Sequence, residues 1–433
     1  MNCVHYPNLN EHVYKEVLSN GLTVTVIPRP GFMRKMAYFV TDFGSIHRQF
    51  TFEGEDYTVP AGIAHFLEHK MFDMPGDRDI TAELAELGAS VNAFTSYDMT
   101  AYYFSCTDNF ERCLDILLQF VSTPYFTEES VTKEQGIIDQ EIGMNADAPD
   151  SKVFEYLMES MYRHHDIRTP ILGTSASIRE ITPENLYACH RAFYTPANMI
   201  LCIVGDVDPE QVKAQALAVL GEEKRPVGVK APIPAEDRSC PVQFRQEKMD
   251  VAMPTFQLAF KCDPVGKGES AIRQEIVADL AAEALFGESS LLYLEMYERG
   301  LIDSSFGGGF ETVDGCAMLS CGGDSHHPEA IRDAIIARAE QIAKQGIDEK
   351  DFLRMKRSAM GRRIRRLDSF DSTCFRLCAY HFADFDYFRF PAVYEAVTEE
   401  ELRNFLQDAV KAECCSLTRI DPIAEGENIN ELD

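Results

Sequence analysis

The stretch 64–70 places two histidines and a glutamate at helical spacing. On an α-helix, residues four apart lie on one face, so His65 and His69 project together from consecutive turns, with Glu68 beside them. Two ring nitrogens on one face make half of a tetrahedral metal site. The chain must therefore fold so that another segment brings further ligands to this helix, unless the helix is a surface element with two solvated histidines.

The order H-x-x-E-H suits zinc catalysis. Catalytic zinc has three protein ligands and an open position for water, with a carboxylate nearby that takes the proton of that water. The motif supplies two ligands and this base, and it is the inverse of the commoner H-E-x-x-H order of zinc proteases. Imidazole and carboxylate ligands suit zinc best, although manganese or cobalt would also fit.

A later helix is a candidate source of carboxylates. Thr127 has the character of an N-cap, with acidic residues in the first turn, and the helical pattern runs to about Asn145. Glu134 and Glu141 are two turns apart in this helix and face the same way. On spacing alone they fit a solvated helix surface as well as a metal site.

Strand-like segments surround the motif helix. Residues 14–29 form two runs around an Asn-Gly turn, and 35–41 is a further strand. After the motif, 89–95 and the aromatic-rich 99–106 form a hairpin. This order predicts a sheet on which the motif helix lies.

The second half of the chain repeats this order of strands and helices without the metal motif. Four prolines among charged residues in 222–246 are typical of an interdomain linker. We therefore expect an N-terminal zinc-bearing domain, 1–221, and a homologous C-terminal domain, 247–433. The expected fold class is α+β, with a mostly antiparallel sheet packed with helices in each domain.

Charge and cysteine content limit the partners and the compartment. The chain has 41 Lys and Arg against 70 Asp and Glu, and its net charge of −29 argues against nucleic acid or an anionic membrane as partner. No secretory signal or membrane-length apolar run is evident. Thirteen cysteines without a C-x-x-C pair indicate reduced thiols and a cytoplasmic location. Cys374 and Cys378 share a helix face, where packing is favoured over metal binding.

Four features together are typical of one family. They are the H-x-x-E-H motif, the pair Glu134 and Glu141, the strand at 92–95 and the run 194–206. On these features the chain resembles, over essentially its whole length, the inverted-motif zinc peptidases, which include pitrilysin, insulin-degrading enzyme and the mitochondrial processing peptidase. Its length matches the half-size bacterial and mitochondrial members, whose subunits pair to enclose a peptide-binding chamber.

This resemblance assigns roles to individual residues. It implies that His65, His69 and Glu141 bind one zinc ion per chain, that Glu68 is the general base, and that Glu134 is a supporting catalytic carboxylate. The implied activity is that of a zinc-dependent endopeptidase cleaving peptides or small unfolded polypeptides in a chamber formed by two subunits, with zinc-activated water as the nucleophile.

The resemblance also assigns a place for the substrate. It implies that the strand holding Asn92, Ala93 and Phe94 is the edge to which an extended peptide adds by backbone hydrogen bonds. The alternative is that these residues belong to an ordinary sheet hairpin with no role in binding.

The second half departs from the family pattern. Self-sufficient relatives carry an Arg and, six positions on, a Tyr, where this chain has Tyr297 and Asp303, and Arg299 is offset by two positions. We therefore expect a homologous partner subunit that carries the Arg/Tyr pair, with a homodimer as the alternative, and a lone chain that is weak or inactive. The competing hypotheses are a non-catalytic binding or assembly subunit and a hydrolase acting on something other than peptides.

Overall fold

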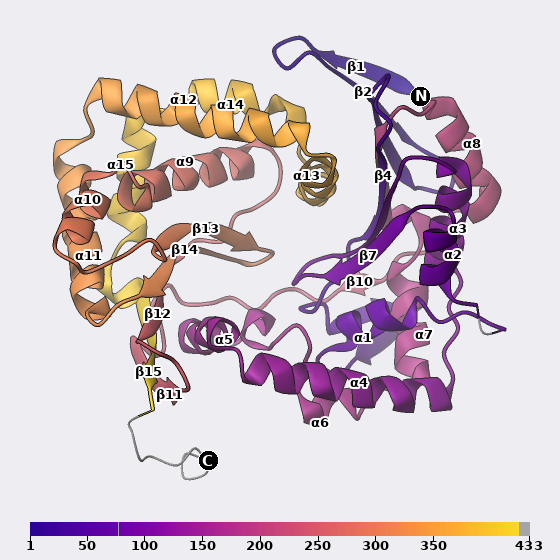
Figure 1. The fold of residues 1–433 in the computed structure, drawn as a ribbon, viewed down its shortest axis with the longest axis horizontal. Coiled ribbons are helices and arrows are strands. Elements are labelled where there is room, and N and C mark those ends of the chain that lie inside the picture. The colour runs from indigo at the N-terminus through magenta and orange to yellow at the C-terminus, as the bar shows by residue number, and fades with distance from the viewer. Residues whose placement is uncertain (77, 424–433) are drawn as a thin grey trace. The chain divides into compact units, whose positions relative to one another are not determined.

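The chain folds into two compact units. The computed structural model describes residues 1–76 and 78–423 (Figure 1). Unit 1 comprises Met1–Ile142, Pro170–Pro232 and Arg362–Arg389, and unit 2 comprises Gly143–Thr169, Ile233–Gly361 and the chain from Phe390 onwards. The domain boundaries expected on either side of 222–246 stay a prediction, and residues 424–433 of the expected C-terminal domain lie outside the described part.

Unit 1 is built on a seven-stranded sheet. Its strands are β1 (Asn2–Tyr6), β2 (Glu11–Val17), β3 (Thr23–Pro28), β4 (Lys35–Thr41), β7 (Ser90–Thr95), β8 (Thr100–Cys106) and β9 (Met199–Gly205). Their order is β1-β2-β3-β9-β4-β8-β7, and only the β3–β9 pair is parallel. The predicted hairpins β2–β3 and β7–β8 are confirmed, and β7 lies at one edge of the sheet.

The helices of unit 1 include the motif helix, α1. They are α1 (Ile63–Lys70), α2 (Ile80–Glu86), α3 (Phe110–Ser122), α4 (Glu128–Ala146), α6 (Ser175–Ile178), α7 (Pro183–Phe193), α8 (Pro209–Leu220) and α13 (Phe370–Phe382). Helix α1 is almost wholly buried and packs on β7 and β8, as predicted. It begins after Gly62, whose φ of 88° favours glycine and where a Cβ would lie 2.4 Å from the Leu172 carbonyl oxygen. The start of α1 is thereby held close to the neighbouring backbone.

A small second sheet and a late helix complete unit 1. The small sheet joins β5 (Gln49–Phe52), β6 (Glu55–Thr58) and β10 (Val229–Lys230), so the segment 222–246 contributes a strand to it. Helix α13 packs on β4 and β9, and the Tyr38 hydroxyl donates to Asp371 Oδ1 at 2.5 Å. Cys374 and Cys378 are fully buried in α13. Unit 1 thus takes part of its core from the last quarter of the sequence.

Unit 2 has a sheet of five strands. They are β11 (Phe244–Met249), β12 (Thr255–Cys262), β13 (Gly307–Val313), β14 (Cys316–Asp324) and β15 (Cys415–Pro422), in the order β11-β15-β12-β14-β13. Only β11 and β15 are parallel. Each unit therefore has a mostly antiparallel sheet packed with helices, which confirms the expected α+β class.

Helices from both halves of the sequence pack in unit 2. They are α5 (Pro149–Met161), α9 (Glu269–Phe286), α10 (Leu291–Glu298), α11 (Pro328–Gln345), α12 (Glu349–Arg365), which runs on into unit 1, α14 (Phe390–Ala396) and α15 (Glu399–Ala409). Helix α5, from the first half of the chain, packs against β11, β12 and β15. None of the helices among the described residues has both the length and the apolar character of a membrane span.

A buried carboxylate fixes the end of α5 within unit 2. Glu236 accepts hydrogen bonds from the backbone N–H groups of Arg163, His164 and His165, and it pairs with Lys261 Nζ at 3.1 Å. The two charged side chains are only 5% and 4% exposed. Burial alone would raise the pKa of Glu236, but these donors outweigh it and lower the pKa to about 2. The ionised carboxylate therefore joins the residues that follow α5 to the segment that precedes β11, the first strand of the unit 2 sheet.

We expect Glu236→Gln to lower the free energy of unfolding by about 2 kcal/mol at pH 7, because it weakens charge-assisted hydrogen bonds and leaves Lys261 without its counter-charge. The folded-state pKa of Glu236 lies below the ordinary value of 4.5, so its contribution is full above pH 4.5 and is lost as the pH falls towards 2. Urea unfolding at pH 7 and pH 3 should show the difference between variant and wild type shrinking at the lower pH.

The matched control is Glu340→Gln, because Glu340 forms an exposed pair with Lys344 on α11 and its loss should change stability by less than about 0.5 kcal/mol. A difference at Glu236 that is equally large at both pH values would contradict the role of its charge.

Candidate metal centre

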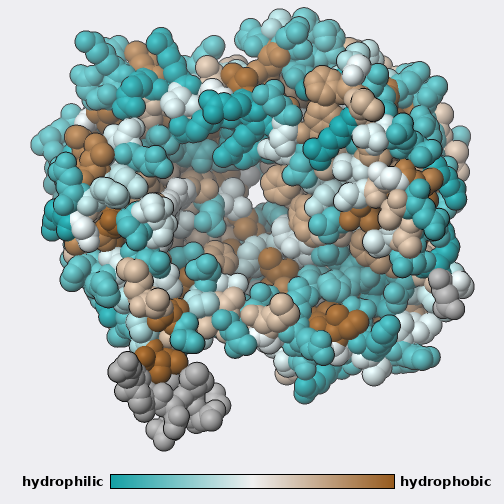
Figure 2. All heavy atoms as spheres, viewed as in Figure 1, coloured by the Kyte–Doolittle hydropathy of each residue, from teal (hydrophilic) through white to brown (hydrophobic). Residues whose placement is uncertain are grey.

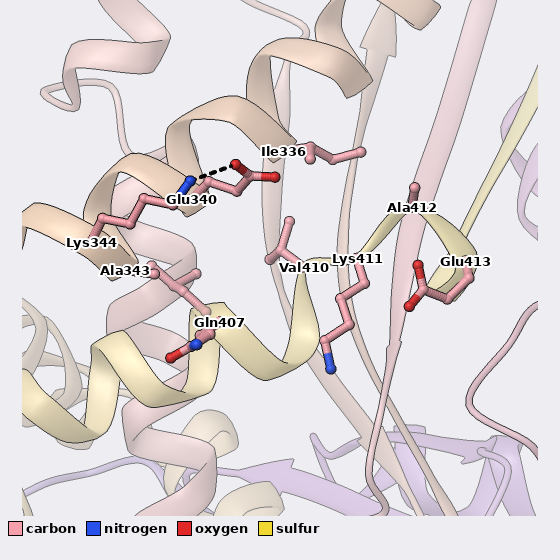
Figure 3. Close-up of a pocket in the computed structure, with 10 residues that line it drawn as sticks. Ile336, Glu340, Ala343, Lys344, Gln407, Val410, Lys411, Ala412 and Glu413 are labelled. Atoms are coloured by element: carbon pink, nitrogen blue, oxygen red, sulfur yellow. Dashed lines mark hydrogen bonds and ion pairs between the residues drawn. The ribbon is translucent and has the colours of Figure 1, made fainter.

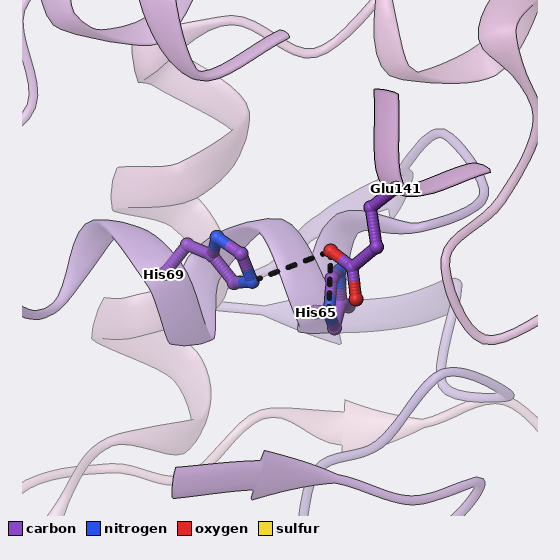
Figure 4. A group of neighbouring side chains, drawn as sticks. All are labelled: His65, His69 and Glu141. Atoms are coloured by element: carbon purple, nitrogen blue, oxygen red, sulfur yellow. Dashed lines mark ion pairs between the residues drawn. The ribbon is translucent and has the colours of Figure 1, made fainter. Parts of the chain in front are cut away.

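Helices α1 and α4 bring three ligand atoms together, as Figure 4 shows. Nε2 of His65 lies 3.7 Å from Oε2 of Glu141, and Nε2 of His69 lies 3.8 Å from the same oxygen. All three atoms are within 4.8 Å of one another. Ligands about 2.1 Å from a tetrahedral zinc ion are about 3.4 Å apart, so a small contraction would allow these residues to bind one. We call His65, His69 and Glu141 the metal centre.

His69 is oriented by Glu134. Its Nδ1 lies 3.0 Å from Glu134 Oε1, and because a carboxylate only accepts, Nδ1 carries the proton and Nε2 keeps its lone pair for a metal. Burial would lower the pKa of His69, but this hydrogen bond and the surrounding carboxylates raise it. Burial would likewise raise the pKa of Glu134, but His69 lowers it. Glu134 thus does for His69 what outer carboxylates do for metal-bound histidines.

His65 is held neutral by its surroundings. Burial, with a smaller contribution from the charge of His69, lowers its pKa to about 4, so it is unprotonated at neutral pH and can offer a lone pair. Its Nδ1 is buried and has no hydrogen-bond partner among residues 1–76 and 78–423. The tautomer of His65, unlike that of His69, is therefore not selected by a second protein group.

Glu68 lies beside the metal centre and is 8% exposed. Burial raises its pKa, an effect partly offset by a hydrogen bond from the Thr95 hydroxyl to Oε2 at 2.6 Å and by the charge of His69. A carboxylate with a raised pKa next to a metal centre has the character of a general base. The sequence alone does not indicate Thr95 as its partner, although alternation along β7 puts Thr95 on the same face as Ala93, which packs towards the core of unit 1.

The proposed substrate strand is an edge strand. Within the described chain β7 pairs with β8 alone, so the backbone of Asn92, Ala93 and Phe94 has one side without a neighbouring strand. The Asn92 side chain accepts a hydrogen bond from the Ala93 N–H at 2.9 Å. The ring of Phe94 lies 5.8 Å from that of Phe375 on α13. Within the sheet of unit 1 this edge of β7 has no strand partner, and the Ala93 N–H is bonded locally.

Comparison with known proteins identifies the family of the chain. The insulinase family, peptidase family M16, matches residues 54–175, and the M16 inactive domain matches residues 180–359. The chain is 38% identical over 426 residues to YmfH of Bacillus subtilis (strain 168), named an uncharacterized zinc protease, covering 97% of this chain and 99% of that protein. The chain belongs to the M16 family of zinc proteases.

Solved structures agree with this assignment. An M16-like peptidase from Alicyclobacillus acidocaldarius has a TM-score of 0.92 and 32% identity, covering 97% of this chain and 100% of that one. A chain of complex III2 from Candida albicans, at 14% identity, shares the fold with a TM-score of 0.74, covering 97% of this chain and 98% of that one.

A further relative by sequence is the mitochondrial-processing peptidase subunit beta of Bos taurus, which is 26% identical over 272 residues, 61% of this chain and 51% of that protein. This M16 protein is of the half-size bacterial type.

Unit 2 of this M16 protein has no metal centre among its described residues. Tyr297 of α10 is 55% exposed and stacks on Tyr293, with ring centroids 6.1 Å apart. Asp303 accepts hydrogen bonds from the Ser305 N–H at 2.8 Å and the Ser305 hydroxyl at 2.6 Å, and these bonds lower its pKa. Where self-sufficient relatives carry an Arg and a Tyr, this chain therefore has a phenol and an ionised carboxylate.

A pocket of about 350 Å³ lies in unit 2 between α11 and α15, as Figure 3 shows. Its walls carry the Glu340–Lys344 ion pair together with Lys411 and Glu413. None of the metal-centre residues lines it. In the face of the molecule drawn in Figure 2, hydrophilic side chains cover most of the surface and hydrophobic ones are scattered.

The geometry predicts a graded loss of zinc affinity. Glu141→Gln, which replaces the charged oxygen shared by both histidine contacts, should abolish stoichiometric zinc binding at micromolar metal. Glu134→Gln should weaken binding about 10- to 100-fold, because it perturbs the orientation of His69 without removing a ligand. Competition against a fluorescent chelator measures both.

The matched control is Glu128→Gln in the first turn of the same helix, which should leave zinc affinity unchanged. An equal loss of affinity in all three variants would contradict the centre.

Proposed function

We propose that this chain is a zinc-dependent endopeptidase that cleaves peptides or small unfolded polypeptides. The observation that carries the proposal is that Glu141, on a separate helix, lies within 3.8 Å of Nε2 of both histidines while Glu68 is buried beside them. In this proposal His65, His69 and Glu141 bind one zinc ion. A solvated surface helix gives no reason for these groups to converge.

The residues of the chain divide the chemistry between them. Zinc, when bound, supplies a Lewis acid that polarises a carbonyl group and makes water nucleophilic near neutral pH. Glu68 takes the proton of the attacking water and returns it to the leaving amine. Glu134 keeps the proton of His69 on Nδ1 and so keeps Nε2 available as a ligand.

The free edge of β7 is the proposed binding site for substrate. An extended peptide adding to Asn92, Ala93 and Phe94 would be held by main-chain hydrogen bonds, which are independent of side-chain identity. Adding a strand requires the peptide to be unfolded locally, so the substrate class is peptides and unfolded segments. The cysteines are all unpaired in the structure, and the cytoplasmic location expected from them is part of the proposal.

A second subunit completes the proposed enzyme. Tyr297 and Asp303 occupy the positions of the family's Arg and Tyr, so we propose a homologous partner that carries that pair, with a homodimer as the alternative. One relative is itself named as a subunit, the beta subunit of a mitochondrial-processing peptidase. The competing proposal is a non-catalytic binding subunit, which would have no need of an intact Glu68.

Glu68→Gln should lower kcat by at least about 1,000-fold and leave bound zinc at one per chain, because it removes the general base and no ligand. Hydrolysis of a quenched-fluorescent peptide library and metal content are measured on the same samples, with the variant and wild type prepared in the same way. Unchanged cleavage by the variant would contradict the role of Glu68, and absence of zinc from the wild type would favour the binding subunit.

The lone chain should cleave peptides weakly, and a homologous partner carrying Arg and Tyr should raise kcat/KM at least about 100-fold, because it adds donors for the charge that develops on the carbonyl oxygen. Titration of the partner into a fixed amount of this chain measures the gain. Full activity of the lone chain, typical of a complete metallopeptidase, would contradict the need for a partner.

A further inference from the structure

The hydroxyl of Thr95 and the carboxylate of Glu68 form one of the short hydrogen bonds of unit 1, with 2.6 Å between Oγ1 and Oε2. We propose that Thr95 is the positioning residue of the general base: it holds one oxygen of Glu68 and leaves the other for the attacking water. This inference rests on the proposed function, since it assigns a task within that reaction.

Counting protons fixes the direction of this bond. Each threonine hydroxyl has one proton to donate. The hydroxyl of Thr100 donates to the Phe43 carbonyl oxygen at 2.8 Å, and its oxygen lies 3.5 Å from that of Thr95. The one proton of Thr95 goes to the Glu68 carboxylate, which can only accept when ionised and is much nearer than the Thr100 oxygen, so Oε2 is occupied as an acceptor. Within the described part of the chain no other hydrogen bond to the Glu68 carboxylate is found, so Oε1 is the oxygen left for a water proton.

The sheet fixes where the Thr95 hydroxyl lies. Thr95 stands directly opposite Thr100 in the β7–β8 pair, and Thr100 stands opposite Thr41 of β4. Thr41 and Thr100 are fully buried. A β-branched side chain has a restricted χ1, so this row of threonines across three strands gives the hydroxyl little freedom. Its position is thus determined by strand pairing.

Glu68 needs such a partner because its side chain has three rotatable bonds. The backbone of α1 is held at its start by the close approach of Gly62 to Leu172, but this does not select a rotamer for Glu68. A hydrogen bond from a fixed hydroxyl does select one of the Glu68 rotamers. Misplacement of a catalytic group by about 1 Å can cost about 100-fold in rate, so the contact has a kinetic consequence.

The position of Thr95 also links the base to the substrate strand. Thr95 follows Phe94 on β7, the edge where the peptide is proposed to add, so one strand carries the substrate and the partner of the base. The hydroxyl points to Glu68 while the backbone belongs to the edge. Removing only the hydroxyl should therefore change kcat and leave KM almost unaltered.

The kinetic test compares Thr95→Val, which keeps the shape and removes the hydroxyl, with Thr95→Ser, which keeps the hydroxyl. We expect Val to lower kcat about 10- to 100-fold with KM within about twofold, and Ser to restore at least about half of the wild-type kcat. Zinc content should stay at one per chain in both. The matched control is Thr51→Val, because Thr51 makes a bond of the same kind and the same 2.6 Å length to Asp56 on the exposed β5–β6 hairpin.

Three kinetic results at Thr95, and one at the control position, would overturn the proposal. The three at Thr95 are a Val variant with wild-type kcat, a Ser variant as impaired as Val, and a loss that is confined to KM. The first would show that Glu68 needs no partner, and the second that the shape of the side chain matters and not its hydroxyl. The third would assign Thr95 to substrate binding. A loss of kcat in Thr51→Val would show that any such substitution in unit 1 lowers activity, and would also overturn it.

A second test needs neither metal nor activity. In the metal-free protein, the unfolding midpoints of Thr95→Val, Glu68→Ala and the double variant should be non-additive, since either single change already removes the shared bond. Additive shifts would overturn the proposed contact even if the enzyme is active. Non-additive shifts in a chain that shows no cleavage with any partner would leave the contact standing and would refute the proposed peptidase function instead.

Discussion

The charged and buried groups around the rings of His65 and His69 are the constraint on which the candidate site most depends. Glu68, Glu134 and Glu141 all act electrostatically on His69, while burial keeps His65 neutral. Burial raises the pKa of Glu68 and the charge of Glu141 adds to this effect, because like charges resist ionising together. A divalent cation between the imidazoles and Glu141 would offset that repulsion, so the electrostatics are compatible with the occupant that the ligand geometry suggests.

The rigidity of the centre comes from the helix that carries two of its ligands. Helix α1 is short and would be marginal alone, but burial against β7 and β8 holds it in place. Its start depends on Gly62, where a side chain would collide with the Leu172 carbonyl oxygen. Helix α4 is more exposed, so the third ligand, Glu141, is 40% exposed while His65 is nearly buried. The site is therefore most enclosed at His65 and most exposed at Glu141.

Part of the candidate site and of the sheet could be predicted from the sequence, because helical spacing and hairpin turns involve residues that are close together in the chain. Helical spacing puts His65 with His69 and Glu134 with Glu141, and the Asn-Gly turn predicts the hairpin of β2 and β3. The pairing of the two helices was available only through the family resemblance, since spacing alone left Glu141 as consistent with solvent as with a metal.

What could not be predicted depends on contacts distant in sequence. Helix α13 packs on β4 and β9 although more than 160 residues separate it from either strand, and no local pattern indicates that partner. The strands in 222–246 were hidden by prolines and charges that are typical of a linker. The bond from Thr95 to Glu68 required knowing which face of β7 meets α1, and alternation gives the two faces without saying which helix covers each.

The chemistry of unit 2 underlies the proposal that a partner subunit completes the enzyme. Attack on a peptide carbonyl places negative charge on its oxygen, which is stabilised by hydrogen-bond donors or cations. The Asp303 carboxylate is an acceptor, and its pKa is already lowered by the N–H and hydroxyl of Ser305. Tyr297 can donate one neutral hydrogen bond, which is weaker than the bond of a guanidinium. Neither residue offers the donors of an Arg and a Tyr, which is the chemical reason for proposing a partner that supplies that pair.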